Sequence, residues 1–185
     1  MTDKRNIEIA TLGGGCFWCT EAVFKKVKGV KKVTSGYSGG EETQISYDAV
    51  STGRTAFAEV VQLEFDPTII QFQDILRIFF HVHDPTTLNR QGNDIGPQYR
   101  SVIFFHNPKQ QEVAKSLIEE LNQSTVFAND IVTVVEPYIS FIEAEEYHQD
   151  YFENNPNQGY CRIIIDPKVK KFLKEYKDTG LIKES

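Results

Sequence analysis

The order of the predicted strands and helices constrains the fold of this chain more than any other feature of its sequence. Short apolar or alternating segments predict strands at residues 7–12, 33–37, 58–65 and 101–105. Apolar residues at helical spacing predict helices at residues 16–27 and 70–82. The elements therefore run strand, helix, strand, strand, helix, strand. That order predicts an α+β fold with a ferredoxin-like plait, usually an antiparallel sheet with helices on one face.

The rest of the chain adds long loops and a C-terminal extension to this core. A further helix is expected at residues 110–122, a strand at residues 131–135 and a short helix from Glu143 onward. Residues 36–55 and 83–100 are polar tracts that contain glycine, and long ordered loops are often functional. The extension ends in a lysine-rich stretch with interspersed acidic residues, which predicts a solvated helical tail.

Composition and charge exclude several classes of protein. The 185 residues, 40% hydrophobic and 25% charged, suit one globular domain over residues 1–185. A net charge of −6 argues against nucleic-acid binding, which needs a basic surface. No apolar run is long enough for a membrane span, and residues 1–6 lack the apolar core of a signal peptide. The sequence therefore predicts a protein that binds neither nucleic acid nor membranes.

The three cysteines are the most informative reactive residues. Cys16, Cys19 and Cys161 are an odd number and too few for a secreted disulfide framework, which favours reduced thiols in the cytoplasm. Cys16 follows a predicted strand and three glycines and begins a predicted helix, where free N–H groups and the helix dipole favour a thiolate. A lowered thiol pKa would make Cys16 a nucleophile. The alternative is that Cys16, beside Phe17 and Trp18, is a small buried apolar residue.

Cys16 and Cys19 form a C-x-x-C pair, which has three interpretations. It can be a redox pair of the thioredoxin type, half of a zinc site, or one reactive cysteine beside an inert neighbour. A zinc site needs two further ligands, and only His81 and His83 form a second close pair. Alternation at the end of a helix also explains those histidines, so we expect no metal site.

Beyond the cysteines, the chain contains an ordered set of longer motifs. They are GCFW at residues 15–18 followed by Glu21, SGYSGG at 35–40, HDPTTLNRQGNDIGPQYRS at 83–101, YHQDY at 147–151 and GYC at 159–161. Together they cover roughly residues 7–170. A cysteine with two rings is a weak signal, but the ordered set is specific. It resembles the type A peptide methionine sulfoxide reductase family.

The resemblance implies an enzyme, a peptide-methionine (S)-S-oxide reductase that repairs oxidised proteins. In that reaction the Cys16 thiolate attacks the sulfur of methionine sulfoxide, whose oxygen then needs a proton and hydrogen-bond donors. By family position Glu59 is the acid, and burial would raise the pKa of its carboxyl group. By the same resemblance Tyr47 and Tyr99 donate hydrogen bonds to the oxygen. The simpler interpretations are a solvent-facing strand position for Glu59 and amphipathic rim positions for the tyrosines.

The resemblance assigns substrate binding to Phe17, Trp18 and Asp94. The two rings would enclose the terminal methyl group, and Asp94 would bind the substrate or organise water. Asp94 as a turn-former and Trp18 as a core ring are the structural alternatives. His148 matches the family as well, but we expect a structural ring satisfied by local hydrogen bonds. The family commonly has Gly-His before the Ala-Glu of the acid motif, whereas this chain has the more apolar Ala56–Phe57.

Attack leaves Cys16 as a sulfenic acid, which a second thiol must convert into a disulfide that an external reductant opens. The resemblance places this resolving thiol at Cys161, after an Asn/Gly-rich loop. Cys19 is the alternative, but one helical turn separates it from Cys16, so a disulfide would distort that turn. Thioredoxin is the implied reductant, and no bound cofactor is needed. The S epimer, in oxidised proteins or peptides and free, is the implied substrate of a protein that we expect to be a monomer.

Two other functions compete with this prediction. A thioredoxin-like dithiol oxidoreductase would explain the C-x-x-C pair, but neither the motif at residues 83–101 nor the order of the elements. A ferredoxin-like module that binds an apolar ligand at Phe17 and Trp18 is the non-enzymatic alternative. Only an enzyme would acquire an oxidised cysteine on addition of methionine sulfoxide.

Overall fold

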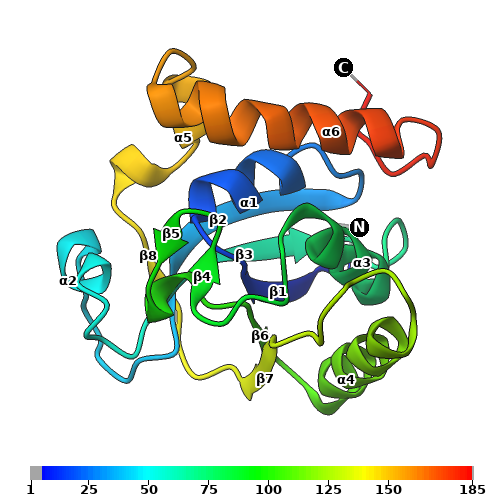
Figure 1. Ribbon diagram of the computed structural model, residues 1–185, viewed down its shortest axis with the longest axis horizontal. Coiled ribbons are helices and arrows are strands. Elements are labelled where there is room, and N and C mark those ends of the chain that lie inside the picture. The colour runs from blue at the N-terminus through cyan, green and yellow to red at the C-terminus, as the bar shows by residue number, and fades with distance from the viewer. Residues whose placement is uncertain (1–5, 185) are drawn as a thin grey trace, which may run out of the picture.

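A six-stranded sheet lies at the centre of the computed structural model, which describes residues 6–184 (Figure 1). Its strands are β1 (Glu8–Gly13), β2 (Val30–Ser38), β3 (Ala58–Phe65), β6 (Val102–Phe105), β7 (Val134–Pro137) and β8 (Ile142–Glu143). They lie in the order β7-β6-β1-β3-β2-β8. Neighbouring strands are antiparallel, except that β7 pairs with β6 in parallel. The α+β class is therefore confirmed, and the sheet is mixed rather than antiparallel throughout.

Several helices join the strands. Within the described residues the helices are α1 (Phe17–Phe24), α2 (Tyr47–Ser51), α3 (Phe72–Val82), α4 (Pro108–Gln123), α5 (Tyr151–Asn154) and α6 (Asp166–Tyr176). Of these, α1 and α4 pack directly on the sheet. The first six predicted elements all occur, as β1, α1, β2, β3, α3 and β6. None of the helices in residues 6–184 is both long and apolar enough to cross a bilayer. The segment tested for a signal peptide lies, apart from Asn6, outside the described residues.

Several element boundaries differ from the prediction for local reasons. Helix α1 ends at Phe24 rather than residue 27, because the next residues tighten into turns in which Lys26 N–H donates to the Val23 carbonyl. Helix α4 begins earlier than predicted, since the Asn107 side chain accepts the N–H of Gln110 at 2.9 Å and caps it. Strand β7 begins at Val134, because residues before it bond to α4 and to the loop after α3.

The predicted loops contain short regular elements. The tract at residues 36–55 holds the end of β2 and helix α2, and the tract at residues 83–100 holds a hairpin. The remaining short elements are β4 (Arg90–Gln91), β5 (Asp94–Ile95), η1 (Pro97–Tyr99), η2 (Glu146–His148) and the π-helical turn η3 (Cys161–Ile165). Helix α6 lies along α1 (Figure 1) and buries Val169 and Phe172. The predicted helical tail therefore occurs, but this face of α6 is buried rather than solvated.

Strand β3 shows how the sheet separates the two apolar layers. Val61 and Leu63 belong to the main core with the helices, whereas Val60 packs with Val102 in a smaller cluster on the opposite face. Because side chains alternate along a strand, Glu59 lies on the same face as Val61. Its carboxyl group therefore points from the buried strand towards the N-terminus of α1.

Candidate active site

Cys16 lies at the junction between β1 and α1, directly after two glycines at which a side chain would clash with neighbouring residues. A Cβ atom on Gly14 would lie 2.8 Å from the Phe79 ring, and one on Gly15, at φ +92°, would lie 2.6 Å from Gln91. Glycine is therefore required for this close approach and for the positive φ. Cys16 itself is the N-cap residue with extended backbone, so it lies outside the helix.

The environment of the Cys16 thiol differs from the prediction. Cys16 is 8% exposed, and burial raises the pKa of its thiol well above the ordinary value. A hydrogen bond with Cys19 and the charges of Cys19 and Glu59 raise it further, against the opposing N–H of Trp18. The expected lowering of the Cys16 pKa by the helix terminus is therefore wrong, because desolvation outweighs the dipole of a short helix. The resting thiol is protonated.

Glu59 faces this thiol from β3 as a buried acid. Its side chain is 1% exposed, and its Oε2 accepts the backbone N–H of Phe17 at 3.1 Å. Burial raises the pKa of Glu59 to about 8, with a smaller contribution from the charge of Asp94, while the Phe17 N–H opposes the rise. The carboxyl group therefore holds a proton at neutral pH, as a proton donor must. A solvent-facing position for Glu59 is excluded.

Tyr47, at the start of α2, and Tyr99, in η1, lie beside this acid. Burial raises the pKa of Tyr47 to about 12 and the pKa of Tyr99 above its ordinary value. For both hydroxyl groups the charges of Glu59 and Cys16 contribute to the rise. The two phenols thus remain neutral donors near the thiol and the carboxyl group, and the structure brings these four predicted residues together.

An aromatic wall adjoins the thiol. The Phe17 ring is buried among Tyr37, Tyr47 and His148, at centroid distances of 5.7, 6.4 and 5.4 Å. Trp18 stacks on Tyr151 at 3.7 Å, and its Nε1–H donates to His148 Nδ1 at 3.0 Å. His148 thus bonds across the fold, and the expectation of local hydrogen bonds is wrong. The wall supplies an apolar surface with a few polar edges.

The three thiols are free and buried, and interactions link Cys19 to each of the other two. Hydrogen bonding with Cys16 lowers the pKa of Cys19, and the charge of Lys168 and the Tyr160 hydroxyl act in the same direction. The Tyr160 hydroxyl lies 3.9 Å from Cys19 Sγ. Cys161 is fully buried at the start of η3, and after burial the charge of Cys19 raises its pKa. Cys19 therefore interacts with both of the other thiols.

Sequence reasoning assigned no role to two residues that join parts of this site. Tyr160 donates to Asp94 Oδ2 at 2.7 Å and so ties the β4–β5 hairpin to the cysteine network. Glu145 accepts the Tyr37 hydroxyl at 2.9 Å and the N–H of Tyr47 at 3.1 Å, which fixes the start of α2. Tyr160 lies within the GYC motif, which is the signal that pointed to it.

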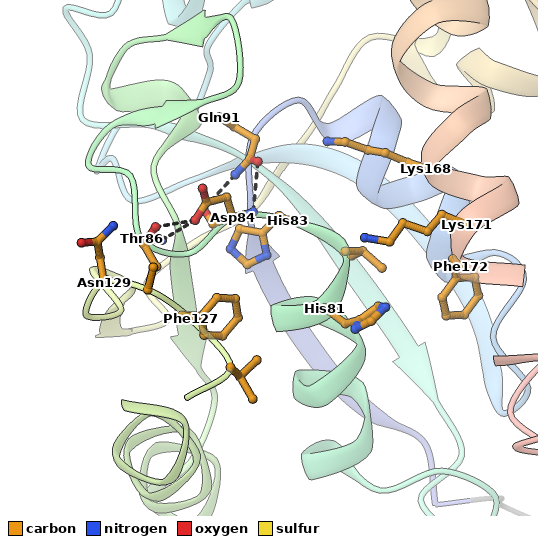
Figure 2. A pocket seen from close by; sticks show the side chains of 13 residues that line it. His81, His83, Asp84, Thr86, Gln91, Phe127, Asn129, Lys168, Lys171 and Phe172 are labelled. Carbon is orange, nitrogen blue, oxygen red and sulfur yellow. Dashed lines mark hydrogen bonds between the residues drawn. The ribbon is translucent and has the colours of Figure 1, made fainter. Parts of the chain in front are cut away.

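A separate pocket of about 480 Å³ lies between α3, the loops that follow α3 and α4, and α6 (Figure 2). Figure 2 shows Lys168 and Lys171 on one side and Asp84 with Gln91 on the other. The pocket is lined by neither a cysteine nor Glu59. Of the two histidines considered for zinc, His81 contacts Glu175 and both ring nitrogens of His83 are hydrogen-bonded. No group of three or more metal-binding side chains occurs within residues 6–184.

Comparisons with known proteins agree on one family. The family model described as peptide methionine sulfoxide reductase matches residues 8–180. A peptide methionine sulfoxide reductase MsrA of Sulfolobus acidocaldarius is 50% identical over 96% of this chain and 99% of its own length. The corresponding protein of Saccharolobus solfataricus is 52% identical over 96% and 99% of the two chains.

Solved structures agree as well. Reduced Mxr1 from Saccharomyces cerevisiae is 38% identical, with a TM-score of 0.77 over 87% of this chain and 92% of its own. Methionine sulfoxide reductase A of Corynebacterium diphtheriae is 32% identical, with a TM-score of 0.79 over 85% and 79%. Mxr1 has also been solved in complex with Trx2, with a TM-score of 0.56, 32% identity and coverage of 82% and 88%.

The fold and the buried thiol beside a protonated carboxyl group are those of a thiol-dependent oxidoreductase. The matched motifs and relatives then identify the family within this class. The chain belongs to the peptide methionine sulfoxide reductase family, as its motifs predicted. A dithiol oxidoreductase of the thioredoxin type and a non-enzymatic binding module are both ruled out as descriptions of the whole chain.

Proposed function

We propose that the chain reduces the S epimer of methionine sulfoxide, in proteins and free, with Cys16 as nucleophile and Glu59 as proton donor. The observation that carries this proposal is the buried Glu59 carboxyl group, with a pKa of about 8, beside the buried Cys16 thiol. An acid with this pKa is protonated at neutral pH and can give its proton to an oxygen that gains charge.

In the proposed reaction Cys16 Sγ forms a bond to the sulfoxide sulfur while Glu59 protonates the sulfoxide oxygen. The hydroxyl group so formed then passes from the substrate sulfur to Cys16 Sγ, and the bond between the two sulfurs breaks, which releases methionine and leaves the sulfenic acid. Tyr47 and Tyr99 donate hydrogen bonds to the same oxygen. The thiol proton of Cys16 then replaces the proton that Glu59 gave. The net reaction balances without a cofactor, since a thiol and a sulfoxide become a sulfenic acid and a thioether. Phe17 and Trp18 enclose the methyl group, and Asp94 orders the polar side of the substrate site.

For regeneration we retain Cys161 as the thiol of the final disulfide and place Cys19 before it. Cys16 lies outside the helix, so a Cys16–Cys19 disulfide leaves the helical turns of α1 in place. Cys19 attacks the sulfenic acid with release of water, and Cys161 then attacks Cys19 Sγ and frees Cys16 as a thiol. This order follows the contact of Cys19 with Cys16 and its proximity to Cys161.

The other properties are proposed on narrower grounds. The complex of the relative Mxr1 with Trx2 supports thioredoxin as the reductant. Three free thiols in the described residues support a cytoplasmic enzyme, and the thiol chemistry proposed above needs no resident cofactor. The antiparallel strands β6-β1-β3-β2 support a ferredoxin-like plait as the core. We also propose a single domain over residues 1–185 that acts as a monomer.

Stereo-resolved reduction tests the proposed activity. With dithiothreitol, and then with thioredoxin and its recycling system, the enzyme is expected to convert only the S epimer of a methionine sulfoxide peptide. The product is measured by chiral chromatography of both epimers. Equal consumption of the R epimer, or no turnover with thioredoxin, would contradict the proposal.

The order of the thiols has its own test. Cys19→Ala is expected to form one equivalent of methionine and then stop with a sulfenic acid on Cys16, because the thiol that contacts Cys16 has been removed. Cys161→Ser is expected to stop at a Cys16–Cys19 disulfide and to lose most thioredoxin-driven turnover. Burst amplitude and disulfide mapping by mass spectrometry measure both. A Cys16–Cys161 disulfide with full turnover in Cys19→Ala would remove Cys19 from the path.

A further inference from the structure

Glu21 is a buried carboxylate outside the proposed chemistry. It lies on α1, one helical turn after Trp18, and is 1% exposed. Its Oε1 accepts the backbone N–H of Asp150 at 3.0 Å, and the N–H of Tyr151 also bonds to the carboxylate. Burying a carboxylate costs free energy unless its hydrogen bonds are satisfied. The helix alone does not need a buried carboxylate at this position, so the two hydrogen bonds call for a separate explanation.

The residues that Glu21 bonds carry the outer part of the aromatic wall. Tyr151 stacks on Trp18, and the His148 ring accepts the Trp18 indole N–H, so both contacts depend on the path of residues 148–151. Asp150 adopts a left-handed backbone at φ +52°, which is unfavourable for a residue other than glycine. The Glu21 carboxylate receives the N–H of this strained residue and so keeps the segment against α1.

The surroundings of Glu21 are charged on two sides. Lys25, the C-cap residue of the same helix, contacts Asp150 and lies 2.8 Å from Glu153 of α5. Burial raises the pKa of Glu21 to about 7. The Asp150 N–H and the charge of Lys25 oppose this rise, whereas the charge of Asp150 adds to it. Lys25 and Glu153 are exposed enough for water to screen them, whereas Glu21 is enclosed. The buried hydrogen bonds to Glu21 therefore hold the segment against α1, while the Gln149 side chain bonds it to Ser35 of β2.

We infer that Glu21 is a positioning residue of the reductase, which holds Tyr151 and His148 against Trp18 and thereby shapes the methyl pocket. The inference rests on the proposed role of Trp18 in binding the substrate. Glu21 touches neither the Cys16 thiol nor the Glu59 carboxyl group in the described hydrogen bonds. Its loss therefore weakens substrate binding and leaves the chemistry at Cys16 intact.

Three substitutions separate the acceptor oxygen from the charge. Glu21→Gln keeps an acceptor at the same reach, Glu21→Asp withdraws it by one methylene, and Glu21→Ala removes it. We expect Ala and Asp to raise the KM for a methionine sulfoxide peptide by about tenfold, the effect of one lost buried hydrogen bond. Gln should stay near the wild-type KM. The methionine burst of a single turnover should be unchanged in all three.

Trp18 is the only tryptophan of the chain, so its fluorescence reports directly on the wall. Emission should move to longer wavelength in the Asp and Ala variants, as the indole loses its ring partner, and stay in place in Gln. Glu153→Ala is the matched control, because it removes an exposed carboxylate that also contacts Lys25. If Glu21→Ala does not fold, the comparison of Glu21→Asp with Glu21→Gln still tests the inference. Wild-type emission and KM in Glu21→Asp, or an equal rise of KM in Glu21→Asp and Glu21→Gln, would overturn the inference. A missing methionine burst in the wild type would instead refute the proposed function.

Discussion

Replacing Cys16 by serine is expected to reduce methionine sulfoxide reduction to the uncatalysed background. A serine hydroxyl is almost fully protonated at neutral pH and is a poor nucleophile towards sulfur, so neither the bond to the substrate sulfur nor the sulfenic acid can form. The loss should be as complete with dithiothreitol as with thioredoxin, because dithiothreitol acts only after the first step. Methionine formed over time from the S sulfoxide is the measurement.

The matched control for this variant is the same change at Cys161. That thiol is buried and free like Cys16, but in the proposed cycle it takes part only in regeneration. Cys161→Ser should still release one equivalent of methionine in a burst, whereas Cys16→Ser should release none. Both proteins should unfold at similar denaturant concentrations, since each change replaces one buried sulfur by oxygen. Turnover by Cys16→Ser with dithiothreitol would show that another thiol performs the first step.

The fold could be predicted to the extent that it depends on local patterns. Strand β3 was predicted with its observed bounds, because Val61, Leu63 and Phe65 alternate with less buried residues and fix both type and face. Strand β7 was misplaced by three residues at its start. Its position depends on hydrogen bonds from Val132 to Pro85 and from Ile131 to Asn122, and no local pattern encodes such distant partners.

The site divides in the same way. Motifs placed Cys16, Glu59 and the tyrosines in one reaction, and the structure brings them together. The protonation of Cys16 could not be predicted, because it depends on how much desolvation opposes the helix terminus, and the degree of burial is a property of the whole fold. The bridge from Asp94 through Tyr160 to Cys19 joins segments far apart in the chain and was missed for the same reason.

The raised pKa values of Cys16 and Glu59 belong together. Both groups are buried in one site, burial is the largest cause of both shifts, and a charge on Glu59 makes Cys16 harder to ionise. The Cys16 thiol and the Glu59 carboxyl group therefore both hold their protons in the resting site, which suits a neutral sulfoxide as ligand. In the proposed mechanism charge first develops when the substrate oxygen begins to draw the Glu59 proton, so the proton donor, rather than a preformed thiolate, starts the reaction.

This dependence makes Glu59→Gln the second variant with a large expected effect. Glutamine fills the same space and still accepts the Phe17 N–H, but it cannot deliver a proton, so kcat/KM should fall by about 10² to 10⁴. In the wild type the protonated, active form of Glu59 is lost as pH rises through about 8, which gives kcat/KM an alkaline limb there. The variant should lack that limb. The pH profile of kcat/KM for both proteins is the measurement.

Stability supplies the control that the variant is folded. The folded-state pKa of Glu59 lies above its ordinary value of 4.5, so its contribution to stability is fully present below that value and is lost as pH rises through about 8. Glutamine does not ionise, so it does not place a charge in the buried site at alkaline pH. Glu59→Gln should therefore be more stable than the wild type at pH above about 8 and should lose this advantage under acid conditions. Urea unfolding at several pH values measures the difference. A variant that is folded and stabilised at alkaline pH, yet keeps wild-type kcat/KM and its alkaline limb, would show that the tyrosines or water deliver the proton instead of Glu59.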